Sequence, residues 1–414
     1  MLRRRGWATK AGREVACPLF FSFSFPIRII QCYVAPVKIK IVGAGIGGVT
    51  LAAALTRYCV DFEIHEASRD LRATGYGLIL QHNALSALDW VGLGDVVRNC
   101  GNRIDHGWIR TPSGRTLSRI NVEAYAIHRG TLLEQLAERI AESSFRVGSR
   151  VDSSGNDCDF VVAADGVNSI FRQMLVPHEA PPRDGRCTAW RGLVHRLDRA
   201  VTHDASTFTE TWGNGTRYGI VPIDAGRMYW FAVAPIQPLG NFKHIYSFLM
   251  DTFSGWHAPI KMLLEQTDAT SILETRLQDR LPIPRWHQER IILLGDSAHP
   301  MTPNLGQGGC QAIEDAVVLA YLFKQVQERS IPADEVGRSF ERLRRDRVHS
   351  IVERSFYLGR IANVTNPAVV WFRNLTIQLT PISLQKRQLR DILTFVPPSL
   401  SPPMGIKEPA STIP

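Results

Sequence analysis

One glycine-rich turn near the start of the chain limits its fold more than any other feature. It lies within Val37–Glu66, which predicts a buried strand, a glycine turn, a helix and a second strand that ends on an acid. Gly43 permits the tight turn, Gly45 lets a pyrophosphate approach the amides at the helix start, and Gly48 allows the helix to pack closely on the strand. Glu66 follows at the distance where an acid binds a ribose. The unit predicts binding of an adenine dinucleotide, either NAD or FAD.

A second strand–turn–helix unit lies far down the chain and bears on the choice between these dinucleotides. Arg290–Leu294 predicts a buried strand, followed by Asp296 and by a loop that ends in Gly308 and Gly309. Asp296 can bind a hydroxyl group of a sugar alcohol. The amides of these two glycines lie at the positive end of the following helix and would point to a site where negative charge develops. An NAD dehydrogenase does not need this second unit, whereas a long FAD lying between two units does.

Two further segments place polar side chains near the expected cofactor. Asp159–Ser169 predicts a buried strand that ends on Asp165, and the carboxyl ends of such strands are where ligands bind. Arg129 precedes a helix predicted over Leu132–Ala141, which begins with a capping box, so we expect its cation to face a phosphate or a flavin edge. The alternatives are a turn-forming role for Asp165 and a surface position for Arg129.

Between Cys187 and Ala234, apolar residues recur at every second position, the pattern typical of strands. Thr207–Trp212 and Thr216–Ile223 predict a hairpin around a Gly-Asn-Gly turn, and Met228–Val233 adds a further strand. We expect an antiparallel sheet that forms one wall of a pocket. The aromatic residues expected on this wall are Trp190, Trp212, Tyr218, Tyr229 and Trp230.

The composition is that of an ordinary globular protein of 414 residues, with 44% hydrophobic and 21% charged residues. The net charge of +9 comes from scattered basic residues without a nucleic-acid-binding signature, so we expect no nucleic-acid partner and a surface that favours phosphate-bearing cofactors. Seven cysteines without paired spacing indicate reduced thiols in a cytoplasmic enzyme and no metal site. We also expect no stable membrane span.

The two ends of the chain are expected to differ from the rest. The first 35 residues combine a basic start with a short apolar run interrupted by Pro26 and Arg28, which fits a targeting segment or an ill-defined extension. Residues 330–360 predict a basic helix with a solvated face, and residues 396–414 predict a disordered tail. The arginines assigned to the solvated face are Arg342, Arg344, Arg345 and Arg347.

With these residues, the chain resembles the FAD-dependent aromatic hydroxylases, the single-component flavoprotein monooxygenases. The matching motifs are the turn Gly43–Gly48, Asp165-Gly166, and the long run from Gly295 to Ala320, GDSAHPMTPNLGQGGCQAIEDAVVLA. They occur in family order, and the resemblance extends to about Arg390. Within the family, the chain is most similar to the urate hydroxylase and zeaxanthin epoxidase-like branch. It is shorter than the family pattern between residues 145 and 159, where members carry an additional strand pair.

The resemblance implies a non-covalent FAD and NAD(P)H as co-substrate, with Asp165 serving both. Besides the glycines at 43, 45 and 48, the implied FAD contacts are Glu66, Gly77, Arg129, Asp165, Asp296 and Gly309. Arg217 and Tyr229 match positions that act on the substrate in urate hydroxylase-like members, and Arg191 and Tyr218 are further candidates. Arg217 and Tyr229 lie on adjacent strands and can share one face. The alternative is an exposed Arg217 and a Tyr229 packed in the sheet.

The predicted fold is α/β, a Rossmann-like FAD-binding domain with an inserted antiparallel-sheet substrate domain and C-terminal helices. The expected boundaries are 36–175 and 286–330 for the FAD-binding domain, 176–285 for the substrate domain and 331–395 for the helices, between the extension 1–35 and the tail 396–414. The expected activity is hydroxylation or epoxidation of a small organic substrate, aromatic or isoprenoid, such as a secondary metabolite, with NAD(P)H and O2. The alternatives are a flavin-dependent reductase or dehydrogenase, an NAD-dependent dehydrogenase, and an inactive flavoprotein that binds a partner.

Overall fold

The computed structural model describes residues 37–69, 76–153, 155, 157–195, 204–224, 226–236 and 242–398. The contacts separate Met1–Ala35 from Pro36–Pro414, and all described residues belong to the second of these units. The predictions for the extension 1–35 and for most of the tail 396–414 therefore lie outside the described residues.

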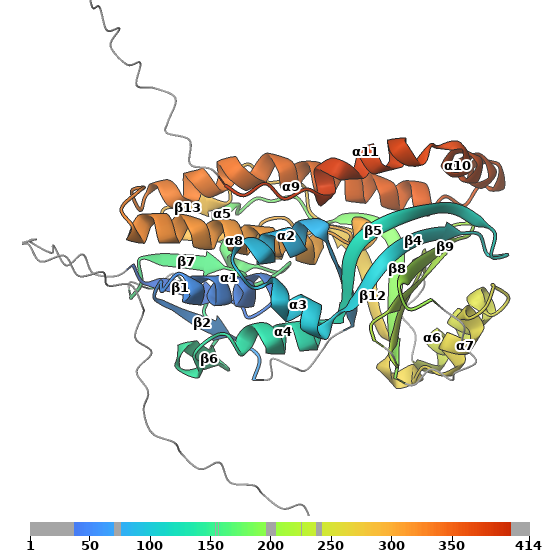
Figure 1. The fold of residues 1–414 in the computed structure, drawn as a ribbon, viewed down its shortest axis with the longest axis horizontal. Coiled ribbons are helices and arrows are strands. Elements are labelled where there is room, and N and C mark those ends of the chain that lie inside the picture. Colours follow the sequence, from blue (N-terminus) through green and yellow to red (C-terminus); the bar gives the residue numbers. More distant parts are fainter. Residues whose placement is uncertain are drawn as a thin grey trace, which may run out of the picture. The chain divides into compact units, whose positions relative to one another are not determined.

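A six-stranded sheet carries the glycine turn (Figure 1). In sheet order its strands are β13 (His287–Gln288), β14 (Ile291–Leu293), β7 (Phe160–Ala163), β1 (Ile39–Val42), β2 (Phe62–Glu66) and β6 (Phe145–Val147). All neighbours pair in parallel except β13 with β14. Every residue of β1 and β7 is buried, as expected for parallel strands covered on both faces. The strands predicted before and after the glycine turn are confirmed.

Helices cover this sheet and form the larger hydrophobic core with it. They are α1 (Ile46–Arg57), α2 (His82–Trp90), α3 (Gly94–Cys100), α4 (Arg129–Ala137), α5 (Ile170–Leu175), α8 (Gly308–Gln327) and α9 (Glu335–Ala362). Helix α1 packs against α4 and α8, and α8 packs against α9. The two predicted glycine units thus share one core.

The prediction for the start of α4 was wrong. The helix begins at Arg129 rather than Leu132, and its N-cap residue His128 makes no side-chain capping bond, so the predicted capping box is not the start signal. The reason is that the preceding strand runs directly into the helix, because His128 is still extended when Arg129 turns helical. Arg129 therefore occupies the first helical turn.

The second sheet has eight strands and contains the predicted hairpin. In sheet order its strands are β12 (Leu273–Asp279), β8 (Arg183–Val194), β11 (Met228–Pro235), β10 (Arg217–Pro222), β9 (Thr207–Trp212), β4 (Asn102–Arg110), β5 (Thr116–His128) and β3 (Gly77–Gln81). Neighbours are antiparallel except β4 and β9. The sheet is wider than expected, because β3, β4 and β5 precede the predicted substrate domain in the sequence and still join it.

The two faces of this sheet have different neighbours. On one face, α6 (Phe242–Phe253) and α7 (Ile260–Glu265) pack on large side chains and form a separate core. The other face borders cavities. Two further helices, α10 (Pro367–Leu379) and α11 (Ile382–Leu393), pack on β5. No helix in the described ranges has the length and apolarity needed to cross a membrane.

The solvated face predicted for the basic helix was wrong at Arg344. This side chain is buried, and its guanidinium pairs with Glu314 and Asp315 of α8, with the Nε atom 2.7 Å from Asp315 Oδ1. Arg347 also pairs with Glu314, at 3.1 Å. The cause is that α9 packs along α8, so the arginines facing that helix compensate two buried carboxylates. Arg342, on the opposite side of α9, is exposed.

Candidate active site

A cavity of about 500 Å³ lies at the start of α1. Gly43, whose φ of +104° favours glycine, and Gly45 line it. An added Cβ at Gly45 would meet no atom within 4 Å, so this position opens onto free space. An added Cβ at Gly48 would lie 1.9 Å from the backbone oxygen of Gly43. The two glycines therefore differ in purpose, because Gly45 keeps the cavity open while Gly48 keeps the helix against the turn.

The three polar residues expected to bind the cofactor here, Glu66, Arg129 and Asp165, all line the same cavity. The Glu66 carboxylate accepts hydrogen bonds from the amides of Ala44 at 2.8 Å and Ser68 at 2.7 Å. Asp165 accepts one from the amide of Ile170 at 3.0 Å through Oδ2, whereas its buried Oδ1 has no partner. Burial raises the pKa of Asp165. A buried carboxylate oxygen that no protein group satisfies is available to accept a hydrogen bond from a ligand.

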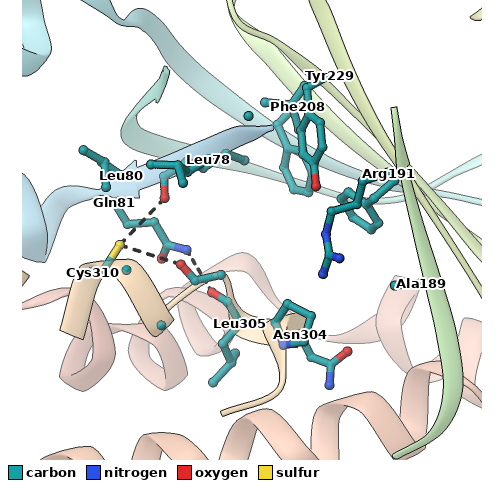
Figure 2. A pocket seen from close by; sticks show the side chains of 18 of the residues that line it. Leu78, Leu80, Gln81, Ala189, Arg191, Phe208, Tyr229, Asn304, Leu305 and Cys310 are labelled. Carbon is teal, nitrogen blue, oxygen red and sulfur yellow. Dashed lines mark hydrogen bonds between the residues drawn. The ribbon is translucent and has the colours of Figure 1, made fainter. Parts of the chain in front are cut away.

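A second cavity, of about 390 Å³, lies between α8 and the eight-stranded sheet (Figure 2). Gly77, Asp296 and Gly309 line it, together with Gly308 at the first position of α8. This helix end carries partial positive charge and free amides. The Asp296 side chain is accessible from the cavity, but the protein around it desolvates the carboxylate and raises its pKa, against the attraction of His299 and Arg129.

Three of the four candidate substrate residues line this second cavity, and one does not. Arg191, Arg217 and Tyr229 come from β8, β10 and β11. In the register, Arg217 lies opposite Val233 and Tyr229 opposite Val221, so both point to the same face. Tyr218 points to the other face, where it is fully buried and stacks on Trp230. Its inclusion in the pocket was wrong because neighbouring strand residues alternate between faces.

The predicted aromatic wall divides for the same reason. Trp190, Tyr218 and Trp230 belong to the core beneath α6 and α7, so they line no substrate wall. Tyr229 lines the second cavity, and Trp212 lines a neighbouring apolar one.

Arg217 is buried rather than exposed and belongs to a polar network that sequence reasoning missed. Its Nη1 atom donates to Glu210 Oε1 at 3.0 Å, and its Nη2 atom donates to Asn304 Oδ1 at 2.7 Å. Asn304 in turn donates to Thr302 Oγ1 at 2.9 Å and to the backbone oxygen of Ser355 at 3.0 Å. The network ties the loop before α8 to the sheet and to α9. Glu210 lies in a predicted strand seven residues before Arg217, but strand alternation alone does not show that the two side chains pair. The second partner, Asn304, lies 87 residues beyond Arg217, so this contact leaves no local pattern.

Tyr229 and Arg191 come from adjacent strands and lie beside each other on the same wall of the second cavity (Figure 2). Burial raises the pKa of Tyr229, against the lowering effect of Arg191, so the phenol is protonated at neutral pH and can donate a hydrogen bond. Arg191 donates to Thr275 Oγ1 at 3.1 Å. Cys310 also lines the cavity, but burial raises the pKa of its thiol to about 12, so it is no nucleophile. The described residues contain no cluster of three potential metal ligands.

A third cavity, of about 390 Å³, adjoins the second and is lined mainly by apolar side chains. It lies between strands β4, β5 and β9 and helices α10 and α11. It shares six lining residues with the second cavity: Ile79, Gln81, Phe208, Glu210, Asn304 and Leu305. None of the sequence patterns pointed to this cavity, because its walls come from separate segments spread between Ile79 and Leu393.

The residues of the first two cavities fit FAD. Gly45 lines the first cavity and the next residue, Ile46, lines the second, so a long ligand that passes the start of α1 reaches both. The open space at Gly45 admits a pyrophosphate beside the helix amides. Asp165 offers an unpartnered carboxylate oxygen, and Asp296 faces the second cavity. An NAD molecule bound at the first unit alone would leave the second helix end without a ligand.

Comparisons with known proteins agree with this fit. A family described as an FAD binding domain matches residues 125–355. The aurachin C monooxygenase/isomerase of Stigmatella aurantiaca is 36% identical over 385 residues, covering 87% of this chain and 98% of that protein. The 2-heptyl-3-hydroxy-4(1H)-quinolone synthase of Pseudomonas aeruginosa is 30% identical, covering 86% and 98%. In fold, the chain is similar to Klebsiella pneumoniae HpxO complexed with FAD and uric acid, with a TM-score of 0.78 and 24% identity, covering 86% and 96%.

The family match includes the second glycine unit and the strands of the antiparallel sheet from β8 onward. This agreement selects the monooxygenase over the alternatives considered from the sequence. The chain is an enzyme of the FAD-binding, aromatic-hydroxylase-type family of flavoprotein monooxygenases.

Proposed function

We propose that the protein oxygenates a flat aromatic ring that carries an apolar tail, using NAD(P)H and O2. The observation that carries this proposal is the pair of adjoining cavities. The second cavity presents Arg191, Arg217 and Tyr229 on one wall and the positive end of α8 on the other. The third cavity continues from it with an apolar lining. Each volume, about 390 Å³, is within the range of small-molecule sites.

The names of the two sequence relatives support a substrate of this kind. The Pseudomonas aeruginosa protein is named for a quinolone product that bears a heptyl chain, and the Stigmatella aurantiaca protein is named for aurachin C. A ring in the second cavity and a tail in the third would occupy both spaces.

When bound, FAD would supply the redox chemistry, with NAD(P)H as the reductant and O2 as the oxidant, one oxygen atom going to the ring and the other leaving as water. The residues of this chain would bind FAD, orient the substrate and polarise the reacting groups. Gly45 and the start of α1 would hold the pyrophosphate, Glu66 the ribose, and Asp296 the sugar-alcohol chain. The Gly308 and Gly309 amides would stabilise negative charge on the reduced ring.

On the substrate side, the Tyr229 phenol would donate a hydrogen bond to an oxygen of the ring, and the Arg191 cation beside it would favour an anionic form of that oxygen. Arg217 would act mainly by position, because both of its terminal nitrogens are already bound by Glu210 and Asn304. The loop that carries Asn304 is thereby held over the cavity and excludes water from it. We place the reaction in the cytoplasm, where NAD(P)H is available and where the free cysteines of the described chain would stay reduced.

A series of 2-alkyl-4(1H)-quinolones of increasing chain length tests the proposal. Binding is measured by quenching of tryptophan fluorescence, since Trp108 and Trp212 line the third cavity. Turnover is measured as NADPH and NADH oxidation with oxygen uptake. We expect affinity to rise about fourfold for each methylene that enters the cavity, and NAD(P)H oxidation to rise on addition of substrate.

A matched variant separates the two parts of the proposal. Val122→Phe narrows the third cavity without touching the second. It should remove the gain from long chains while short-chain quinolones bind as before. Affinity that is independent of chain length in the unmodified protein would contradict the tail site. Binding without stimulated NAD(P)H oxidation across quinolones and other aromatic compounds would contradict the proposed substrate class.

A further inference from the structure

Helices α10 and α11 expose an unusually apolar surface. Trp371, Phe372 and Leu379 of α10 are 66%, 65% and 71% exposed, and Ile382 and Leu384 of α11 are 54% and 44% exposed. We call these five residues the apolar face. Exposed groups of large apolar side chains mark contacts with a protein or a membrane.

The inner side of helix α10 combines apolar residues with one buried arginine. Val370 is buried, and Ile377 lines the third cavity. The one charged residue of the helix, Arg373, is buried and donates to the backbone oxygens of Ala362 at 2.8 Å and Gly213 at 3.2 Å. The outer side of α10 therefore has no charge. The largest side chains that α10 exposes are aromatic or aliphatic, which favours contact with an apolar environment.

Cations accompany the apolar face. Lys386, Arg387 and Arg390 of α11 are exposed, and none of them forms an ion pair with the part of the chain that the structure describes. Asp391 is the one acidic residue within residues 367–398, against four basic ones. A surface that combines exposed tryptophan and phenylalanine with unpaired cations is complementary to a bilayer with anionic headgroups.

We propose that the apolar face and these three cations dock the protein on the surface of an anionic lipid bilayer. The helices would lie in the headgroup region without spanning the membrane. A second copy of the chain fits this surface poorly, because a two-fold contact would bring the same cations together.

The position of the surface suggests what docking would serve. In Figure 1, α10 and α11 lie over β5, with which both make contact. Ile377 of α10 and Leu389 of α11 line the third cavity from within. A lipophilic substrate dissolved in the bilayer would therefore lie close to the cavity proposed for its tail. This last step rests on the proposed function, whereas docking itself does not.

Co-sedimentation of the full chain with lipid vesicles tests docking without any measure of activity. Vesicles of phosphatidylcholine alone are compared with vesicles that also contain phosphatidylglycerol, at low and high salt. We expect binding to the anionic vesicles, weakened by salt. The double variant Trp371→Ser with Phe372→Ser should bind at least about tenfold more weakly, and each of Arg387→Gln and Arg390→Gln should lower affinity about fivefold.

Met174→Ser is the matched control, because Met174 is 48% exposed on α5, outside this surface. It should bind vesicles as the unmodified chain does, and all variants should retain FAD and their unfolding temperature. Equal binding of the unmodified chain and the aromatic double variant would overturn the proposal, as would no binding to anionic vesicles. Light scattering that shows a dimer in the unmodified chain and a monomer in the double variant would also overturn it, since a second copy would then cover the face.

Discussion

Gly45→Val should separate cofactor binding from folding. The backbone at Gly45 has a φ of −73°, which valine adopts without strain, and an added Cβ meets no atom within 4 Å. Valine is a poorer N-cap residue than glycine, but it also restricts the unfolded chain. These two effects oppose each other, so we expect the free energy of unfolding of the apoprotein to change by less than about 1 kcal/mol.

The effect on FAD should be much larger. The first amides of α1 have no acceptor within the helix and are free to bind a pyrophosphate. The valine side chain would project into the cavity where that group would lie. Losing two charge-assisted hydrogen bonds costs about 3–6 kcal/mol, since each contributes about 1.5–3 kcal/mol. The Kd for FAD should rise by a factor on the order of 10²–10⁴.

Gly48→Ala is the contrasting change on the same turn. Its added methyl group would lie 1.9 Å from the backbone oxygen of Gly43, which cannot move without opening the turn. We expect a loss of about 1–3 kcal/mol in the free energy of unfolding, with FAD lost only as the fold loosens. Thermal unfolding of the apoproteins and FAD titration by flavin fluorescence distinguish the two variants. Undiminished FAD affinity in Gly45→Val, or a drop in stability like that of Gly48→Ala, would refute the assignment.

Three further changes test other parts of the site. Asp296→Ala should weaken FAD binding by about 1.5–3 kcal/mol, and an unchanged Kd in a flavin titration would remove this carboxylate from the cofactor site. Tyr229→Phe should bind FAD and be reduced by NAD(P)H as before, but release hydrogen peroxide in place of product; full coupling of NAD(P)H oxidation to product would argue against its role. Arg344→Met should lower the free energy of unfolding by about 3–5 kcal/mol at neutral pH, because it leaves Glu314 buried without its main cationic partner and Asp315 with His299 alone. Burial alone would raise the pKa of both carboxyls, but their cationic partners lower it below the unfolded value. The stabilisation is therefore present above the unfolded pKa values near pH 4 and is lost as the pH falls below them. A stability difference between the variant and the unmodified chain that persists in acid would contradict this.

The sequence by itself determined the parts of the site that depend on neighbours along the chain. The glycine turn from Gly43 to Gly48, its strands and the acid Glu66 lie within a single strand–helix–strand unit, so their spacing predicts their arrangement. The shared face of Arg217 and Tyr229 also followed from the sequence, because a short turn fixes the register of the two strands and side chains alternate along each.

Only the tertiary structure decided which predicted side chains line a cavity and which are buried elsewhere. A period of two divides a strand into two faces but does not show which face is covered by helices. Tyr218 was therefore placed with Tyr229, although α6 and α7 bury Tyr218 on the other face of the sheet. Arg344 shows the same limit in a helix: its charge predicted solvent, and only the packing of α9 on α8 revealed two buried carboxylates facing it. The apolar third cavity was invisible for a related reason, since its walls are brought together by long-range packing that leaves no local pattern in the sequence.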